Sequence, residues 1–252
     1  MKLENKVVVV TGASSGMGKG IVECFVKEGA KVVAVARRKE RLEALKESLK
    51  DTSGVVLPFV GDVSKKEDCE GMIDCALSSF GRLDILVNNA GVMDDMASVA
   101  DFLDSKYDYV MGINVYGPMC TMRKAIQVFL EQGDGGNIIT VSSVGGSHQA
   151  AGVVYGASKA AVNAIVRHTA FVYRNEKIRC NAIAPGGINT GIAQSMGMPN
   201  LDGFGRIKGV QALMPGLVKL KISLLPHYFL ASDESKFISG QILAVDSGWT
   251  AF

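Results

Sequence analysis

A run of β-branched residues that ends in a glycine-rich turn limits the folds open to this chain more than any other feature. Val7 to Thr11 reads as a strand buried on both faces of a parallel sheet, and Gly12, Gly16 and Gly18 follow it before an amphipathic helix. This order lets the backbone approach a pyrophosphate closely, and the N-terminus of the helix favours its charge. The turn therefore predicts a dinucleotide site, with an ordinary strand-to-helix turn as the alternative.

The rest of the chain alternates between strand and helix patterns. Strands are predicted at 31–36, 55–60, 83–87 and 137–141 and near the C-terminus, and helices from 37 to 50, at 65–80, 104–131 and 153–173. This predicts an α/β protein: a single Rossmann-type, doubly wound parallel sheet of about seven strands with helices on both faces. No proline- or serine-rich linker divides the chain, so residues 1–252 are predicted to form one dinucleotide-binding and catalytic domain.

Composition favours small molecules as partners. The 27 basic and 25 acidic side chains give a net charge of +2 and are scattered, so neither nucleic acid nor an anionic membrane is expected as a partner. Five cysteines without a C-x-x-C pair predict reduced thiols rather than disulfides or a structural metal site. A strand pattern begins within six residues of Met1 and no apolar run is long enough to span a membrane, so we expect a cytoplasmic protein without a signal peptide.

The second predicted strand lacks the acid that dinucleotide-binding folds often use to bond the adenosine ribose. It ends at Ala36, and Arg37, Arg38 and Lys39 follow. Three cations at the start of a helix oppose its dipole and call for an anionic partner, for which the 2′-phosphate of NADP is the obvious candidate. The alternative is a solvated charge run that nearby glutamates partly neutralise.

A serine, a tyrosine and a lysine predict proton transfer. Ser142 stands thirteen residues before Tyr155, and Lys159 follows the tyrosine by four, which places the last two on one helix face. A cation lowers the pKa of a tyrosine from its usual value of about 10, and a serine hydroxyl can stabilise charge on a carbonyl or alkoxide oxygen. A second pair, Tyr173 and Lys177, has no such serine and reads as a helix-surface contact.

Three further polar features have both a functional and an ordinary interpretation. The segment Asn88 to Gly91 ends a predicted strand where a flat cofactor could lie, or forms only a turn. Asn114 lies among apolar residues, either as a buried hydrogen-bonding group or as a link in a proton path. His148 could line the same pocket or stand in solvent.

In this order and spacing the motifs resemble those of the short-chain dehydrogenase/reductase family, with a similarity that runs from Val7 to about Gly248. The matching motifs are Thr-Gly-x-x-x-Gly-x-Gly at 11–18, Asp62, Asn-Asn-Ala-Gly at 88–91, Asn114, Ser142, Tyr-x-x-x-Lys at 155–159 and Pro-Gly-x-Ile-x-Thr at 185–190. The resemblance implies that Tyr155 is the acid/base, that Lys159 lowers its pKa and bonds the nicotinamide ribose, and that Ser142 holds the substrate oxygen. Asn114 would tether a water that relays protons through Lys159.

The resemblance also implies an NADP(H) site, because NADP-preferring members carry an arginine just after the second strand, where this chain has Arg37. Asp62 and Val63 would flank the adenine, and Ile188 and Thr190 would contact the nicotinamide carboxamide and the phosphates. The complete predicted cofactor set is Gly12, Ser14, Ser15, Gly16, Met17, Gly18, Arg37, Arg38, Asp62, Val63, Asn89, Ala90, Gly91, Tyr155, Lys159, Pro185, Gly186, Ile188 and Thr190.

Residues 191–225 become irregular and rich in methionine, and in the family this stretch is the substrate lid. Its apolar side chains favour a bulky apolar carbonyl such as a steroid, unless they only pack the lid against the body. The chain departs from many relatives at 218–226, where Pro226 enters a helical pattern. The resemblance further implies a homotetramer that pairs through the helices at 104–131 and 153–173.

The predicted reaction is hydride transfer between NADP(H) and a ketone or secondary alcohol, without a metal. One alternative is a 3-oxoacyl-thioester (acyl-carrier-protein) reductase, whose carrier would need a basic patch such as Arg123, Lys124 and Arg167, although these also fit a solvated helix face. An alternative of another class is a non-catalytic NADP-binding regulator. Such a protein would not need the complete set of Asn114, Ser142, Tyr155 and Lys159, so the set favours an enzyme.

Overall fold

A parallel sheet carries the residues that the sequence singles out. The computed structural model describes residues 1–218 and 220–251, except the side chains at 221 and 222, and within them seven parallel strands lie in the order β3-β2-β1-β4-β5-β6-β7. The strands are Val7–Thr11 (β1), Lys31–Ala36 (β2), Val55–Val60 (β3), Ile85–Asn88 (β4), Gly136–Val141 (β5), Ile178–Pro185 (β6) and Ile242–Val245 (β7). The predicted α/β class with a doubly wound parallel sheet is confirmed.

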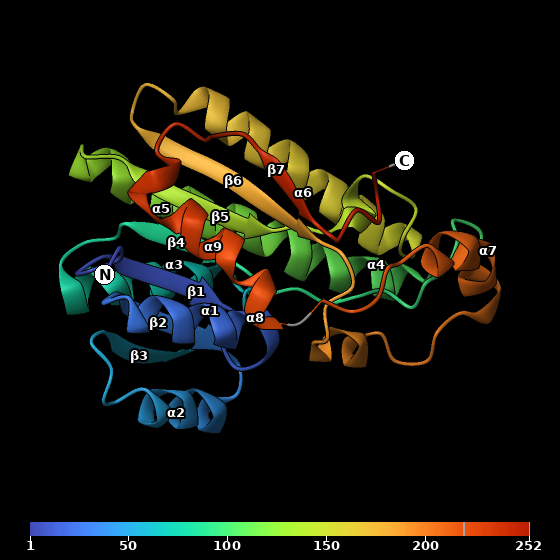
Figure 1. Ribbon diagram of the computed structural model, residues 1–252, viewed down its shortest axis with the longest axis horizontal. Helices are drawn as coiled ribbons and strands as arrows, with labels where there is room; N and C mark the ends of the chain where they lie inside the picture. Colours follow the sequence, from blue (N-terminus) through green and yellow to red (C-terminus); the bar gives the residue numbers. More distant parts are fainter. Residues whose placement is uncertain (219, 252) are drawn as a thin grey trace.

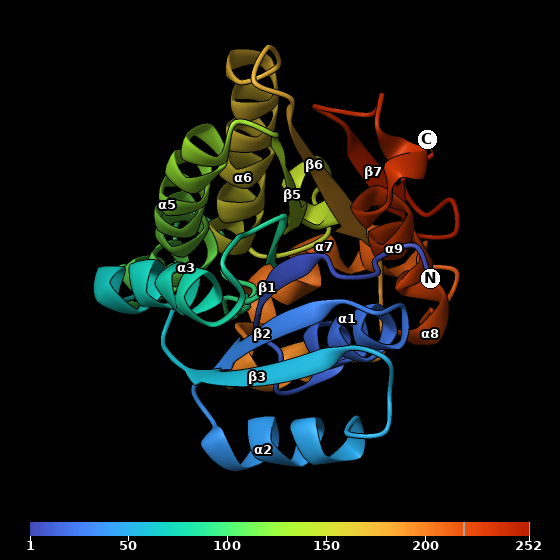
Figure 2. The ribbon, with the colours of Figure 1, turned by 90° about the vertical axis from the view of Figure 1, so that its left-hand side faces the viewer.

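The strands are apolar on both sides because each face of the sheet is covered. In β1, Val7 and Val9 belong to one hydrophobic core and Val8 and Val10 to the other, as the twofold alternation of a strand requires. Helices cover both faces (Figures 1 and 2). The first core takes side chains from α3 (Lys66–Phe80), α5 (Gly117–Gln132) and α6 (Val153–Val172), and the second from α1 (Gly16–Lys27), α2 (Lys39–Ser48) and α9 (Leu225–Ala231).

The order of the strands reverses at β1, which lies between β2 and β4. The connections after β1 and β4 therefore lead to opposite sides, and a crevice opens at the carboxyl ends of these two strands. Gly12, the first residue after β1, has φ +70°, a conformation that favours glycine. The predicted dinucleotide turn thus lies at the position where ligands of open α/β sheets bind.

The helix predicted at 104–131 is interrupted near Asn114. α4 (Asp104–Met111) leads into a π-helical turn, η1 (Gly112–Tyr116), and α5 follows. Pro118 stands four residues after Asn114 and has no N–H to donate to its carbonyl, so regular α-helical bonding is broken here. The predicted long helical stretch is therefore present, but a π-helical turn replaces regular α-helical bonding around Asn114, a candidate site residue.

The helix predicted at 153–173 ends at Val172 as α6. Tyr173 is its C-cap, and Lys177 lies in the following turn with φ +59°. These two residues do not share a helix face, so the prediction of a helix-surface contact between them is wrong. The i, i+4 spacing has this meaning only while the helix continues.

The segment at 191–225 is more regular than its sequence suggests. It contains η3 (Gly191–Ser195), α7 (Leu201–Ala212) and α8 (Leu220–Ser223), and the side chain of Asn200 caps α7 by accepting the N–H of Gly203 at 2.8 Å. Pro226 lies in the first turn of α9, where its missing N–H removes no helical bond. Two short 3₁₀ turns, η2 (Val144–Gly146) and η4 (Asp233–Ser235), complete the elements. No helix in the described part of the chain has the length and apolar character needed to cross a bilayer.

Candidate active site

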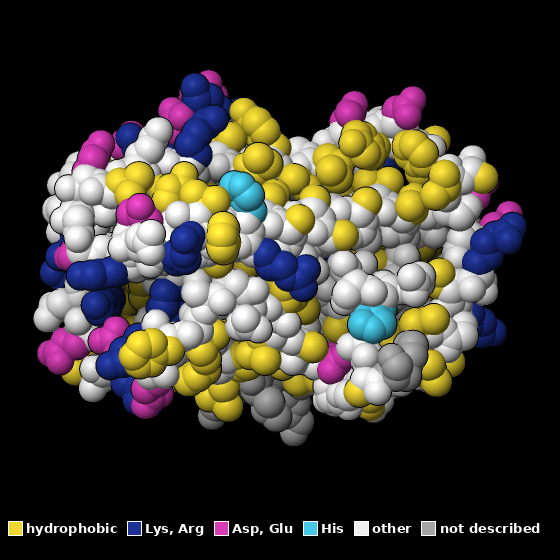
Figure 3. Space-filling model, turned by 90° about the horizontal axis from the view of Figure 1, so that it is seen from above, with side chains coloured by type: hydrophobic (Ala, Val, Ile, Leu, Met, Phe, Trp, Pro, Cys, Tyr) yellow, Lys and Arg dark blue, Asp and Glu magenta, His cyan; other side chains and the backbone are white. Residues whose placement is uncertain are grey.

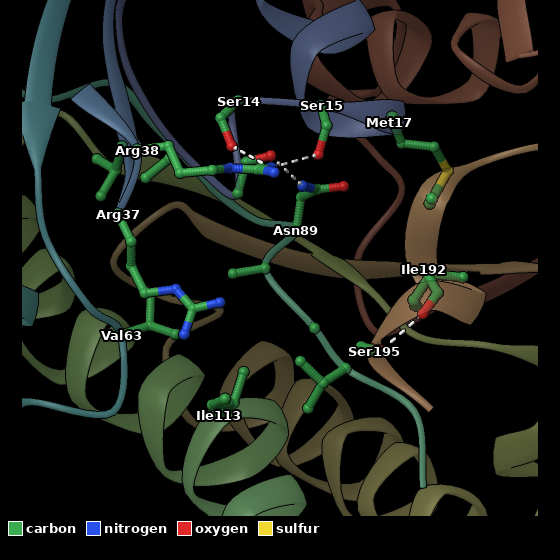
Figure 4. A pocket seen from close by; sticks show the side chains of 18 of the residues that line it. Ser14, Ser15, Met17, Arg37, Arg38, Val63, Asn89, Ile113, Ile192 and Ser195 are labelled. Carbon is green, nitrogen blue, oxygen red and sulfur yellow. Dashed lines mark hydrogen bonds between the residues drawn. The ribbon is translucent and has the colours of Figure 1, made fainter. Parts of the chain in front are cut away.

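The crevice beside β1 and β4 gathers predicted cofactor residues from five different connections, those that follow β1, β2, β3, β4 and β6 (Figure 4). The structure also places Ile113, Ile192 and Ser195 in its lining, which the sequence did not point to. The predicted residues that line it are Gly12, Ser14, Ser15, Gly16, Met17, Arg37, Arg38, Asp62, Val63, Asn89, Ala90, Gly91 and Thr190.

The glycine turn has the shape that a pyrophosphate needs. A Cβ at Gly12 would lie 2.7 Å from Nδ2 of Asn89, and a Cβ at Gly18 would overlap the carbonyl of Gly12. Asn89 donates to the carbonyl of Thr11 at 2.8 Å and so ties the ends of β4 and β1 together. The small turn at the N-terminus of α1 therefore fits a dinucleotide whose phosphates lie against the backbone.

Arg38 reaches across the crevice to the glycine turn. Its Nη2 donates to Oγ of Ser14 at 3.0 Å and to Oγ of Ser15 at 3.1 Å, as the dashed lines in Figure 4 show. Burial, followed by the charges of Arg41 and Arg37, lowers the pKa of Arg38. Since no described carboxylate forms a salt bridge with Arg38, a guanidinium and two hydroxyls converge where an anion would be stabilised.

Arg37 points away from this group, towards the connection after β3 (Figure 4). There Oδ1 of Asp62 accepts the N–H of Ser64 at 3.0 Å and its hydroxyl at 2.8 Å. Burial opposes ionisation of Asp62, but the two bonds from Ser64 and the charge of Arg37 together lower its pKa. The two arginines therefore differ in position, because Arg38 lies by the glycine turn and Arg37 by Asp62.

Tyr155 and Lys159 lie in the first two turns of α6 and are 7% and 3% exposed. Nζ of Lys159 donates to the carbonyl of Val141 at 2.8 Å and lies 5.7 Å from the centre of the Tyr155 ring. Burial raises the pKa of Tyr155 to about 12 and lowers the pKa of Lys159 to about 8. The sequence argument expected the lysine to lower the pKa of the tyrosine, but in the protein alone desolvation dominates because both side chains are almost fully removed from water.

The serine beside the tyrosine is Ser143 and not the predicted Ser142. Oγ of Ser142 donates to Oδ1 of Asn163 at 2.6 Å, and the residue is 2% exposed. The side chain of Ser143 hydrogen-bonds Tyr155 and lowers its pKa, against the larger effect of burial. Successive side chains at the end of an extended strand point to opposite sides, so only one of the two serines can face the tyrosine. The geometry therefore corrects the prediction for Ser142.

Asn114 is buried and fully engaged. Its Oδ1 accepts the N–H of Val92 at 2.9 Å, and its Nδ2 donates to the carbonyl of Val92 at 2.9 Å and to Oγ of Ser158 at 3.1 Å. A Cβ at Gly91 would lie 3.4 Å from Oδ1 of Asn114 and 3.5 Å from Nζ of Lys159. Asn114 and Lys159 therefore flank Gly91 at the edge of the crevice.

Some of the predicted residues after β6 pack within the protein, and one lines the crevice. Pro185 ends the strand, the N–H of Gly186 is bonded to β7 at 3.0 Å, and Ile188 pairs with the segment at 218. Thr190 lines the crevice, and its Oγ1 accepts the N–H of Ile192 at 3.4 Å. Only the last of the four predicted residues therefore reaches the crevice.

His148 lies on the connection between β5 and α6, where its Nδ1 is 3.0 Å from Oγ of Ser147. It lines a second hollow, between this connection and α7, that also includes Met96 and Ile207. Among the described residues, no group of three or more His, Cys, Asp or Glu side chains could hold a metal ion.

Comparison with known proteins gives three consistent results. The family profile described as short chain dehydrogenase matches residues 6–200. The chain is 38% identical over 252 residues to a 3beta-hydroxysteroid dehydrogenase 2 of Eggerthella lenta, and the match covers 99% of this chain and 96% of that protein. It is 32% identical over 258 residues to a 3-oxoacyl-[acyl-carrier-protein] reductase of Thermotoga maritima, and that match covers 98% of this chain and 99% of the reductase. The crystal structure of a short-chain type dehydrogenase/reductase from Mycobacterium marinum superposes with a TM-score of 0.89 at 28% identity, covering 100% of this chain and 98% of the other.

Proposed function

The chain belongs to the short-chain dehydrogenase/reductase family of oxidoreductases, which act on alcohol and ketone groups with a nicotinamide cofactor, and on that premise we propose that it transfers hydride between NADP(H) and a bulky apolar ketone or secondary alcohol such as a hydroxysteroid. The observation that carries the proposal is that Ser143, Tyr155 and Lys159 lie together, with Nζ of Lys159 next to Gly91, which lines the crevice. When bound, the cofactor supplies or accepts the hydride.

Proton transfer is assigned to the residues of α6 and its neighbours. Tyr155 gives a proton to the carbonyl oxygen during reduction and takes it from the hydroxyl during oxidation. Ser143 donates a hydrogen bond to the same oxygen, and the charge of Lys159 favours the phenolate when it forms. Asn114, across Gly91 from Lys159, is assigned the role of tethering a water that relays protons through Lys159.

The preference for NADP(H) rests on the anion site at the glycine turn. β2 ends in Ala36 without an acid, and Arg38 meets the hydroxyls of Ser14 and Ser15 within 3.1 Å. A 2′-phosphate would accept charge-assisted hydrogen bonds from these groups, whereas the ribose hydroxyl of NAD would leave the guanidinium without an anion. Arg37, Asp62 and Val63 would then hold the adenine.

The substrate class rests on the lid and on one relative. Residues 191–225 are proposed to cover the substrate, and Val210 and Met214 from this segment pack against the buried Val144, Ala150 and Trp249. These two side chains anchor the segment, whereas Met198, Phe204 and Leu213 of the same segment are 90%, 41% and 58% exposed, and such unpacked apolar side chains favour a substrate with a large apolar surface. The hydroxysteroid dehydrogenase of Eggerthella lenta, 38% identical to this chain, supports the same class.

A 3-oxoacyl-thioester reductase is the second candidate, supported by the Thermotoga maritima relative. It would need cations free to meet an acidic carrier protein. Arg123 is paired with Glu70 at 3.4 Å and Lys124 with Asp74 at 2.8 Å, so two of the three predicted cations are already neutralised. Their pairing favours the steroid-type substrate over the carrier-bound thioester.

We also propose that the protein is cytoplasmic and assembles as a homotetramer through α5 and α6. The five cysteines of the described chain are all free thiols, which suits a reducing compartment. Tyr116 on η1, Met119 on α5 and Phe171 on α6 are 46%, 51% and 68% exposed, and Figure 3 shows hydrophobic side chains gathered in patches on one face. Light scattering after size exclusion tests the assembly.

The decisive experiment is oxidation of NADPH and NADH against 3-, 7-, 12- and 17-ketosteroids, an acetoacetyl thioester and small ketones. NADPH-dependent turnover of a ketosteroid supports the proposal, whereas turnover of the thioester alone replaces it with the second candidate. Tight NADPH binding without turnover of any carbonyl in the panel would leave two readings, a substrate outside the panel or the non-catalytic regulator.

A further inference from the structure

Residues 93–97, which follow β4 and are here called the strap, lie between the lid and α6. On the lid side, the N–H of Met93 donates to Oγ of Ser195 at 2.9 Å, and the carbonyl of Asp95 accepts the N–H of Asn200 at 2.7 Å. On the α6 side, the carbonyl of Ala97 accepts the N–H of Val153 at 3.0 Å. Contacts to the two elements therefore alternate along the strap.

Asp94 contacts the first turn of α6 through its side chain. It is 1% exposed, its Oδ2 accepts the N–H of Tyr155 at 2.8 Å, and its Oδ1 accepts the N–H of Met96 at 3.1 Å. The N–H of Val154 also acts on this carboxylate. A buried carboxylate at a helix N-terminus meets unpaired N–H groups and the positive end of the helix dipole, which offset its loss of hydration.

The chain is shaped around this carboxylate. A Cβ on Gly152, the N-cap of α6, would overlap both carboxylate oxygens of Asp94. Asp94 therefore occupies the place that a larger N-cap residue would fill, and the cap of the catalytic helix comes from the strap instead of from the helix itself.

We propose that Asp94 is a positioning residue for Tyr155, whose carboxylate fixes the first turn of α6 so that the phenol meets Ser143 and the substrate, and that the strap makes this position depend on the docked lid. The proposal rests on the proposed function for its kinetic test. Because Asp94 bonds the backbone of Tyr155, it acts through that residue without touching the reacting atoms.

The charge of Asp94 acts on the pKa of Tyr155, so a pH profile can distinguish the proposed role from a purely structural one. Among the described residues, the charged groups near the phenol are Lys159 on α6 and Asp94 on the strap, with Asp95 next to Asp94, while His148 on the β5–α6 connection is bonded to Ser147. Asp94 raises the pKa of Tyr155, after the larger effect of burial. Removal of its charge should therefore lower the pKa of the tyrosine.

The test compares Asp94→Asn with Asp95→Asn in the full chain. Asp94→Asn keeps the shape of the side chain but leaves one oxygen for the N–H groups of Tyr155 and Met96. We expect kcat/KM for alcohol oxidation to fall about 10- to 100-fold, and the pH midpoint of its rise to move down by about 0.5 to 1 unit. Asp95→Asn should leave the midpoint in place.

Gly152→Ala provides the complementary lesion, because it displaces the carboxylate while its charge stays. It should lower kcat/KM in the same way but leave the pH midpoint near the wild-type value. A fall in kcat/KM of Asp94→Asn without any shift of the midpoint would overturn the proposal, since loss of stability alone explains such a result. An unchanged kcat/KM would overturn it equally.

Hydrogen exchange separates this proposal from the proposed function. In Asp94→Asn the amides of Val154 and Tyr155 should exchange at least about tenfold faster than in the wild type, while amides in the middle of α6 keep their protection. This measurement needs no turnover, so it tests Asp94 even if the substrate panel fails. Unchanged exchange at the first turn of α6 would sink the positioning role.

Discussion

The side chain of Ser143 hydrogen-bonds Tyr155, twelve residues further along the chain, whereas the hydroxyl of Ser142 donates to Asn163. After the end of β5, the side chain of Ser143 thus points into the site, and the side chain of Ser142 points into the interior between β5 and α6. The two serines form a matched pair for mutagenesis, because the same substitution should cost activity at one position and stability at the other.

Ser143→Ala should reduce kcat/KM by about 100-fold, since it removes a donor to the reacting oxygen. Ser142→Ala should leave kcat/KM within about threefold but lower the free energy of unfolding by about 1–3 kcal/mol, because the buried Oδ1 of Asn163 loses its donor. Steady-state kinetics and urea unfolding of both variants check this. A larger loss of activity in Ser142→Ala would restore the assignment made from the sequence.

Tyr155→Phe should reduce kcat by at least about a thousandfold while NADPH binding, followed by fluorescence, stays within about twofold of the wild type. The ring remains and only the proton donor is lost. Tyr173→Phe, at the end of the same helix, is the control and should retain activity. Substantial turnover by Tyr155→Phe would show that another group moves the proton.

Arg38→Ala should weaken NADPH binding about 100-fold and NADH binding by less than about threefold, because the lost bonds are those to a charged 2′-phosphate. Addition of Arg37→Ala should weaken binding of both cofactors further and keep the difference, because Arg37 is proposed to contact the adenine that the two cofactors share. Arg41→Ala, on the exposed side of α2, is the control for a general loss of positive charge. Titration with both cofactors measures the ratio, and equal losses for the two cofactors would argue against a phosphate site.

Stability should depend on pH through His227, which is 1% exposed with Nδ1 3.1 Å from the carbonyl of Ser223. Burial, opposed by this bond, lowers its pKa from 6.5 to about 4. As the pH falls below 6.5, the unfolded chain binds a proton at this histidine before the folded chain does. The free energy of unfolding should therefore drop by up to about 3 kcal/mol between pH 6.5 and about pH 4, and above pH 6.5 this contribution to stability is fully present. Denaturant unfolding at several pH values measures the slope.

His227→Gln should flatten this dependence, whereas His168→Gln, at an exposed position of α6, should keep it. A slope that persists in His227→Gln would assign the pH dependence to other groups.

The sequence came close to the architecture because the signals it uses are local. Continuous apolar runs mark strands covered on both faces, and β1, β2 and β3 lie where those runs predict them. Most of the predicted cofactor residues line one crevice because they follow the carboxyl ends of parallel strands, which meet at one edge of the sheet. Pro118 was visible in the sequence as well, but its effect on the predicted helix was missed.

What the sequence determined by itself is the order of strands and helices, the family, and the presence of a tyrosine and a lysine four residues apart on one helix. Tertiary structure alone decided which serine faces that tyrosine, that burial sets its pKa above the usual value, and that Asp94 caps its helix from 61 residues away in the chain. Side-chain direction, desolvation and capping between distant segments depend on what surrounds a residue in space, and residue spacing along the chain does not carry that information.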